Sequence, residues 1–222
     1  MLFKKDFAIL GKISTEAICL TKIYLIRHGE TEWNKIGKLQ GSSDIKLLPE
    51  GIQQARLLAA HTPFSSVDAI YSSDLERAVM TAEILAEKFK LPVIKNMGLR
   101  ETSFGEWEGR FLSELAEENP HGFEKFFTRP DKVQPPNGET FLQSQARVMN
   151  ALEEIIADNK GKNIIVVSHG AAIRLIICAA LVIPIRKMWS IGQYNMALNV
   201  LTFANGNFSV EMMNNTIHLY NF

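Results

Sequence analysis

Short apolar runs alternate with longer amphipathic stretches along most of the chain. The runs are rich in β-branched and aromatic residues, whereas the stretches between them repeat their apolar residues at helical spacing. We predict strands over residues 22–27, 67–71, 91–95 and 164–167. We predict helices over residues 51–61, 74–85 (capped by Asp74), 140–159 and 170–182. This alternation indicates an α/β fold, a three-layer sandwich with a mostly parallel central sheet and helices on both faces.

Two regions depart from this alternation. Residues 197–203 and 208–212 flank Asn205-Gly206, a pair typical of a tight turn, and predict a C-terminal hairpin. Residues 105–140 are broken by glycines and prolines, which predicts an insertion over a sheet edge. Residues 1–21 carry no motif and are interpreted as an N-terminal extension, so one domain is expected over residues 22–222.

The overall composition indicates a soluble globular protein and excludes several partners. Lysine and arginine total 24, as do aspartate and glutamate, so no net field favours nucleic acid or a membrane surface and any anion site must be local. Two cysteines form no disulfide framework, which favours a reducing compartment. The apolar part of residues 1–20 is too short for a signal peptide, and residues 164–185 are interrupted by His169 and Arg174. We therefore expect a cytoplasmic protein.

Three predicted strands end in residues of similar chemistry. The first ends in Arg27-His28, the second is followed by Arg77 in the next helix, and the buried fourth ends in His169-Gly170. Because the carboxyl ends of parallel strands share one edge of the sheet, these side chains could converge there. Helix N-termini at the same place would add a partial positive charge. The sequence therefore predicts a pocket for an anion.

Each of these residues also has an ordinary structural interpretation. A histidine before glycine is more often part of a turn than a nucleophile, and Arg77 alone would suit a surface ion pair with Glu76. His169 is the hardest to explain structurally, because an apolar run leads to it and no local partner is evident. Their placement at three separate strand ends favours the functional interpretation.

Five motifs occur in order along residues 22–219. They are Arg27-His28-Gly29-Glu30-Thr31 with Asn34, Leu39-Gln40-Gly41, Ser72-Ser73-Asp74-Leu75-Glu76-Arg77-Ala78, Leu99-Arg100-Glu101 before Phe104-Gly105, and Val167-Ser168-His169-Gly170. In this combination the chain resembles the histidine phosphatase superfamily, the phosphoglycerate mutase-like enzymes. Only residues 1–21 lie outside the resemblance.

The resemblance implies a role for each of these positions. His28 would be the nucleophile that takes the phosphoryl group, and Glu101 would protonate the leaving oxygen and then activate the attacking water. The other implied catalytic residues, which bind phosphoryl oxygens, are Arg27, Arg77 and His169. The implied substrate-binding residues are Thr31, Asn34, Gln40, Gly41 and Gly170. On the residues alone, Glu101 could equally be an ion-pair partner of Arg100.

Such a site needs no metal ion or organic cofactor, because cationic side chains would stabilise the transferred group. The five histidines show no ligand spacing and the chain has no phosphate-binding loop of the nucleotide-binding type. We therefore expect no cofactor, and activity that persists in a chelator.

The family contains both phosphatases and phosphoglycerate mutases. Residues 110–137 are short for a mutase, and their cations are spread out rather than paired. Aromatic residues of the insertion could wall a pocket for organic leaving groups or simply pack it onto the sheet: Phe111, Phe123, Phe126 and Phe127. We favour a metal-independent phosphomonoesterase that acts on small phosphorylated metabolites, close to broad-range and α-ribazole-phosphate phosphatases. A cofactor-dependent mutase is the alternative, an inactive phospho-ligand binding protein is a weaker one, and a homodimer is left open.

Overall fold

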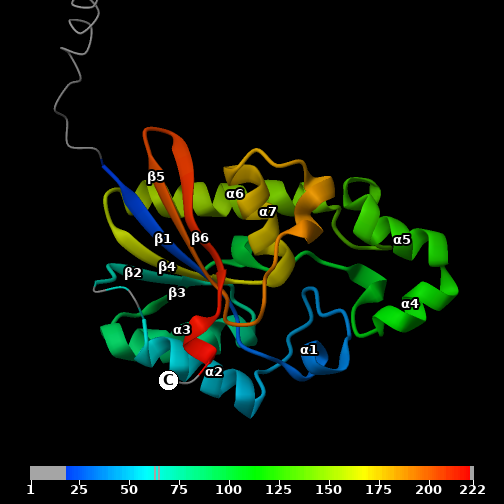
Figure 1. Cartoon of the computed structure of the whole chain (residues 1–222), viewed down its shortest axis with the longest axis horizontal. Coiled ribbons are helices and arrows are strands. Elements are labelled where there is room, and N and C mark those ends of the chain that lie inside the picture. Colours follow the sequence, from blue (N-terminus) through cyan, green and yellow to red (C-terminus); the bar gives the residue numbers. More distant parts are fainter. Residues whose placement is uncertain (1–18, 63, 65, 221–222) are drawn as a thin grey trace, which may run out of the picture.

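A six-stranded sheet forms the centre of the protein in the computed structural model, which describes residues 19–62, 64 and 66–220 (Figure 1). The strand order is β3-β2-β4-β1-β5-β6. The strands are β1 Thr21–Arg27, β2 Ala69–Ser72, β3 Val93–Lys95, β4 Asn163–Ser168, β5 Leu198–Ala204 and β6 Asn207–Asn215. The first four strands of this order are parallel, and β5 and β6 join antiparallel at one side. The predicted mostly parallel sheet is therefore confirmed.

Helices cover both faces of the sheet because successive strand residues point to opposite sides. On β1, Ile23 and Leu25 pack with α6 (Phe141–Asp158) and α7 (Gly170–Ala180). Tyr24 and Ile26 instead pack with α2 (Pro49–Ala60) and α3 (Glu76–Phe89). The apolar residues of β4 divide in the same way and are all fully buried. Two hydrophobic cores thus separate three layers, as predicted.

The C-terminal hairpin is also confirmed. The chain turns at Asn205 and Gly206, which have φ values of 51° and 78°, the left-handed conformation that a two-residue hairpin turn requires. The remaining short elements are α1 Glu32–Ile36, α4 Leu112–Glu118, α5 Pro120–Thr128, and the 3-10 helices η1 Met97–Leu99, η2 Gly105–Trp107, η3 Pro130–Lys132, η4 Ile185–Ser190 and η5 Ile217–Leu219.

The helices of the predicted insertion, α4 and α5, lie beyond the carboxyl ends of the strands (Figure 1). The aromatic side chain of Phe126 on α5 packs on Trp189 of η4, and Trp189 Nε1 donates a hydrogen bond to the Phe126 carbonyl oxygen (2.6 Å). The insertion therefore covers the ends of the strands, with Phe126 buried against Phe141 of α6 and Trp189 of η4.

The predicted helix cap is wrong. Asp74 does not cap α3, whose N-cap is Leu75 without a side-chain bond; the Asp74 carboxylate instead binds Arg100 through two hydrogen bonds of 2.7 and 2.6 Å. Strand β1 begins at Thr21, one residue before the predicted strand, and the buried Thr21 hydroxyl donates to the Asn159 carbonyl oxygen. Residues 1–18 of the predicted extension lie outside the described residues. Within the described part, no helix combines the length and apolar character needed to span a membrane.

Candidate active site

The ends of the central strands meet at one cavity of about 180 Å³. Arg27 ends β1 and lies in register with Ser168, the last residue of β4. His28 follows β1, and its backbone N–H donates to the Ser168 carbonyl oxygen (3.0 Å). Arg77 is the second residue of α3, the helix after β2. Parallel pairing therefore brings together the side chains that the strand ends predicted.

His28 presents a free ring nitrogen. Its side chain is 2% exposed, and Nδ1 lies 2.7 Å from the Gly29 carbonyl oxygen. A carbonyl can only accept, so Nδ1 carries the proton and Nε2 keeps its lone pair. Burial, and then the charges of Arg77 and Arg27, hold the pKa of His28 well below its usual value. The imidazole is therefore unprotonated near neutral pH, which a nucleophile requires.

Arg77 is fully buried and held at three of its nitrogens. Nη2 donates to the Gly41 carbonyl oxygen and Nη1 to that of Ser43, each at 2.7 Å, while Nε donates to Nδ1 of His169 (3.2 Å). A guanidinium group has five N–H donors, so two remain for a ligand in the cavity. Burial lowers the pKa of Arg77 to about 10, which leaves it charged at neutral pH.

The sequence around His169 offers no local partner, but in the structure Arg77, which is distant in sequence, orients its ring. Because its Nδ1 accepts from Arg77, its proton lies on Nε2. Nε2 is buried and has no hydrogen-bond partner among the described residues. The His169 and His28 ring centroids are 5.1 Å apart. Burial first, then the charge of Arg77, lowers the pKa of His169, so the ring is a neutral N–H donor beside the nucleophile.

Two further guanidinium groups lie at the same cavity. Arg27 donates from Nη1 to the Gln193 carbonyl oxygen (2.5 Å), and its buried Nε has no partner among the described residues. Burial, followed by the charge of Arg174, lowers the pKa of Arg27 to about 10. Arg174 lines the cavity and donates to the carbonyl oxygens of Ile191 (2.8 Å) and Gly170 (3.0 Å).

Glu101 is held against the N-terminus of α7. Its carboxyl oxygens accept hydrogen bonds from the backbone N–H groups of Thr102 (2.9 Å), Ala171 (3.0 Å) and Ala172 (2.9 Å). The alternative pairing of Glu101 with Arg100 is wrong, because Arg100 binds Asp74. One carboxyl group therefore faces three guanidinium groups, an excess of positive charge that suits a phosphoryl dianion.

Most of the predicted substrate-binding residues line the same cavity: Asn34, Gln40, Gly41 and Gly170. The Asn34 Oδ1 atom accepts from Asn195 Nδ2 (3.1 Å), so only its amide N–H groups are available to a ligand. Thr31 is placed differently. It is fully buried as the N-cap of α1, and its hydroxyl donates a hydrogen bond to Asn34 Oδ1, which holds the Asn34 side chain in place.

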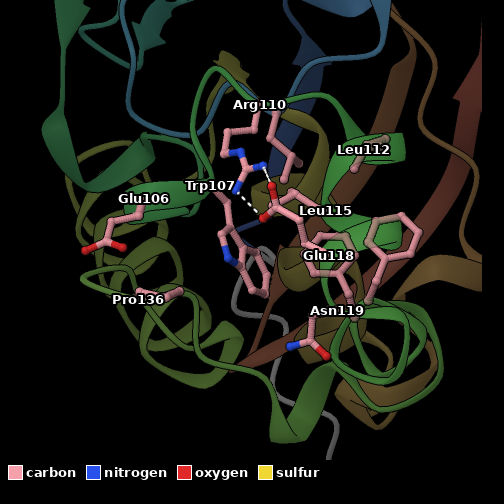
Figure 2. A pocket seen from close by; sticks show the side chains of 11 residues that line it. Glu106, Trp107, Arg110, Leu112, Leu115, Glu118, Asn119 and Pro136 are labelled. Atoms are coloured by element: carbon pink, nitrogen blue, oxygen red, sulfur yellow. Dashed lines mark hydrogen bonds and ion pairs between the residues drawn. The ribbon is translucent and has the colours of Figure 1, made fainter.

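The aromatic residues of the insertion lie at different places in the structure. Phe126 and Phe127 line the cavity at the strand ends, and Phe123 and Phe126 line a second cavity of about 340 Å³ within the insertion. In Figure 2 the indole of Trp107 lies in this second cavity, and the ion pair of Arg110 and Glu118 spans one side of it. Leu39, Leu112 and Phe126 line both cavities and so lie between them. Phe111 is in neither and lies under the Lys38 ammonium group.

Sequence reasoning missed several residues that complete the site. Arg174 lies one helical turn after Gly170, so the strand-end motif could have drawn attention to it. Gln193, Asn195 and Glu108 follow no strand-end motif and reach the site only through tertiary packing. No group of three or more histidine, cysteine, aspartate or glutamate side chains within the described residues is arranged to hold a metal ion.

A comparison with protein families shows to which family the chain belongs. The histidine phosphatase superfamily, branch 1, matches residues 23–216. The chain belongs to this superfamily. It is 35% identical to phosphoserine phosphatase 1 of Hydrogenobacter thermophilus, over 91% of this chain and 96% of that protein. It is 34% identical to the metal-independent phosphoserine phosphatase of Arabidopsis thaliana, over 90% and 84%.

A solved structure agrees with these histidine phosphatase relatives. The phosphoserine phosphatase of Entamoeba histolytica in complex with phosphoserine has 34% identity and a TM-score of 0.81, covering 90% of this chain and 99% of that one. The predicted family, fold class and enzyme class, a histidine phosphatase, are therefore confirmed.

Proposed function

We propose that this histidine phosphatase hydrolyses phosphate monoesters of small carboxylic acids, with phosphoserine as the first candidate, through a phosphohistidine at His28. The observation that carries the proposal is the Nε2 lone pair of His28 beside Arg27 Nε and His169 Nε2, two buried donors that have no hydrogen-bond partner among the described residues. Such preorganised donors stabilise a transferring phosphoryl group without the need for a metal ion.

In the first step the phosphoryl oxygens accept hydrogen bonds from Arg27, from the two free N–H groups of Arg77 and from Nε2 of His169. The lone pair of His28 Nε2 attacks phosphorus, and the bond between phosphorus and the ester oxygen breaks. Glu101 gives its proton to the departing alkoxide, and the alcohol leaves the cavity.

In the second step water attacks the phosphohistidine. The Glu101 carboxylate takes a proton from this water, a P–O bond forms as the P–N bond breaks, and inorganic phosphate is released. His28 Nε2 regains its lone pair, and the backbone bond from Nδ1 to Gly29 keeps the same nitrogen facing the cavity throughout.

Arg174 supports a carboxylate-bearing substrate. Two of its nitrogens bind backbone carbonyl oxygens, and its guanidinium lies over Trp189, 5.3 Å from the ring centroid, at the cavity wall. A planar guanidinium matches a carboxylate in geometry and charge. Relatives named as phosphoserine phosphatases, one of them bound to phosphoserine, favour the same substrate class.

A pair of substrates that differ by one carboxylate tests this proposal. Steady-state hydrolysis of phosphoserine and of phosphoethanolamine should be measured for the wild type and for Arg174→Met. We expect the variant to lose about 10- to 100-fold in kcat/KM for phosphoserine, the value of one charge-assisted pair, and much less for phosphoethanolamine. Equal losses on both substrates would remove Arg174 as the carboxylate partner.

Phosphoglycerate mutase activity is less well supported, because two arginines of the insertion are already in ion pairs. Arg110 binds Glu118, and Arg129 binds Asp131 at 3.0 Å. Incubation with 3-phosphoglycerate and catalytic 2,3-bisphosphoglycerate separates the activities, since free phosphate indicates a phosphatase and 2-phosphoglycerate a mutase. No release of p-nitrophenol from p-nitrophenyl phosphate at pH 5–8 would instead favour the binding protein.

We also propose a cytoplasmic location and a single catalytic domain that carries the insertion at residues 105–140. The composition, with two cysteines and no net charge, supports the former. The continuous sheet and the packing of α5 on η4 support the latter.

A further inference from the structure

Glu108 lies directly after η2, outside the residues that line the catalytic cavity. Its Oε1 accepts hydrogen bonds from the backbone N–H groups of Ser42 (2.9 Å) and Phe104 (3.0 Å). Its Oε2 accepts from the hydroxyl of Ser43 (2.7 Å). One carboxylate thus ties the loop 41–43 to the start of the insertion.

The loop is shaped to receive this carboxylate. Gly41 has a φ of 52°, and a Cβ atom at this position would lie 2.1 Å from Glu108 Oε1. Glycine is therefore required both for the backbone conformation and for the space that the carboxylate fills. The two residues form one interlocked unit.

The opposite side of the loop binds Arg77. The Gly41 and Ser43 carbonyl oxygens accept hydrogen bonds from Nη2 and Nη1 of Arg77, and Nε of Arg77 donates to Nδ1 of His169. A continuous series of hydrogen bonds therefore runs from Glu108 through the loop and Arg77 to the free Nε2 of His169. Among the described residues, the Ser43 N–H donates to the Gln40 carbonyl oxygen (3.0 Å) within the loop itself, whereas the Ser42 N–H and the Ser43 hydroxyl are bonded to Glu108.

We propose that Glu108 is a positioning residue that sets the orientation of Arg77, and through it His169, for phosphoryl transfer. The inference rests on the proposed function and adds a residue that touches neither substrate nor nucleophile. Misplacement of a binding group by about 1 Å can lower the rate by about 100-fold. The carboxylate of Glu108 would prevent that displacement by holding both Ser42 and Ser43.

Three variants test the proposal: Glu108→Ala, Glu108→Gln and, as a matched control two residues away, Glu106→Ala. Glu106 is exposed and its carboxylate accepts a hydrogen bond only from the side chain of Asn137 (2.7 Å) among the described residues, and Figure 2 shows it at the rim of the insertion cavity. Each variant is measured for kcat, KM and the Kd of inorganic phosphate by calorimetry, with thermal unfolding as a check of folding.

We expect Glu108→Ala to lower kcat about 10- to 100-fold and to weaken phosphate binding about tenfold. Glu108→Gln keeps an oxygen acceptor for both backbone N–H groups and should stay within about fivefold of the wild type. Values for Glu108→Ala within twofold of Glu106→Ala, or a Glu108→Gln variant as impaired as Glu108→Ala, would overturn the proposal.

A double variant separates positioning through Arg77 from a general loss of structure. If Glu108 acts through Arg77, adding Glu108→Ala to Arg77→Met should lower kcat no further, because the group that it orients is gone. Additive losses would overturn the proposal. Where Arg77→Met unfolds, the comparison of the two Glu108 variants decides alone.

The outcomes also distinguish this inference from the proposed function. A wild type that binds phosphate but hydrolyses no phosphomonoester would refute the function, while the phosphate Kd of the Glu108 variants would still test the positioning. A wild type that is active, with Glu108→Ala equally active, would refute the positioning alone.

Discussion

Replacing Arg77 by lysine tests the centre of the site. The side chain is fully buried, and its guanidinium holds two carbonyl oxygens and His169 while keeping two N–H groups for the ligand. A lysine ammonium is a single point with three donors and cannot reach these positions together. The substitution keeps the charge but removes the fork, so it isolates geometry from electrostatics.

The magnitude follows from the bonds that are lost. Loss of one preorganised donor to a developing charge costs about 2.7–4 kcal/mol, or about 100- to 1000-fold in kcat. We expect Arg77→Lys to fall in this range, with a smaller change in KM. Incomplete pairing of the Gly41 and Ser43 carbonyl oxygens should lower the free energy of unfolding by about 1–3 kcal/mol.

The assay is steady-state hydrolysis of p-nitrophenyl phosphate together with urea unfolding at the same pH. Arg56→Lys, on the exposed face of α2, is the matched control and should change neither quantity. An Arg77→Lys variant that keeps more than a third of the wild-type kcat would refute the role of the guanidinium fork.

The remaining predictions concern the nucleophile, the metal and acid stability. Wild type should show alkali-stable labelling with 32P substrate, and His28→Ala should abolish both this labelling and turnover; labelling of the variant would assign the nucleophile to another residue. Because the pKa of His28 in the free enzyme lies well below 6.5, the pH profile of kcat/KM should show no enzyme group that titrates near 6.5, and such a group would contradict this. Activity should persist in EDTA, and loss restored only by added metal would refute the metal-free mechanism. Burial lowers the pKa of His218 to about 4, so an unfolded chain binds its proton first and the free energy of unfolding falls between pH 6.5 and 4, by at most about 3 kcal/mol. His218→Leu should make this pH dependence shallower in urea titrations, whereas an unchanged slope would count against His218.

Residues at strand ends were predictable because their position depends on local pattern. One apolar run ends in Arg27-His28 and another ends in His169. Each run predicts a strand, and the position of these residues at its end predicts the edge of the sheet at which their side chains lie. Parallel pairing then brings them together without further information. The same reasoning explains why β4, buried on both faces, was identified from its unbroken apolar sequence.

Contacts between segments distant in sequence were not predictable in this way. Asp74 has the composition of a helix cap, but Arg100 provides a stronger, bidentate partner 26 residues away. Glu108 carries no pattern that reveals its bonds to residues 42 and 43, and its role depends on how the insertion folds back over the strand ends. Burial has the largest effect in lowering the pKa of His28, and burial is a property of the complete fold.

The cluster of guanidinium groups also links the folding equilibrium to the composition of the solution. Arg27, Arg77 and Arg174 repel one another in a buried space that one carboxyl group only partly neutralises. A phosphate dianion that binds only the folded chain would add about 2.7 kcal/mol to its stability at a concentration one hundred times Kd. The product of the reaction is such an anion. Bound phosphate therefore stabilises the folded protein and at the same time inhibits the enzyme. As phosphate accumulates, the melting temperature should rise while the rate of turnover falls.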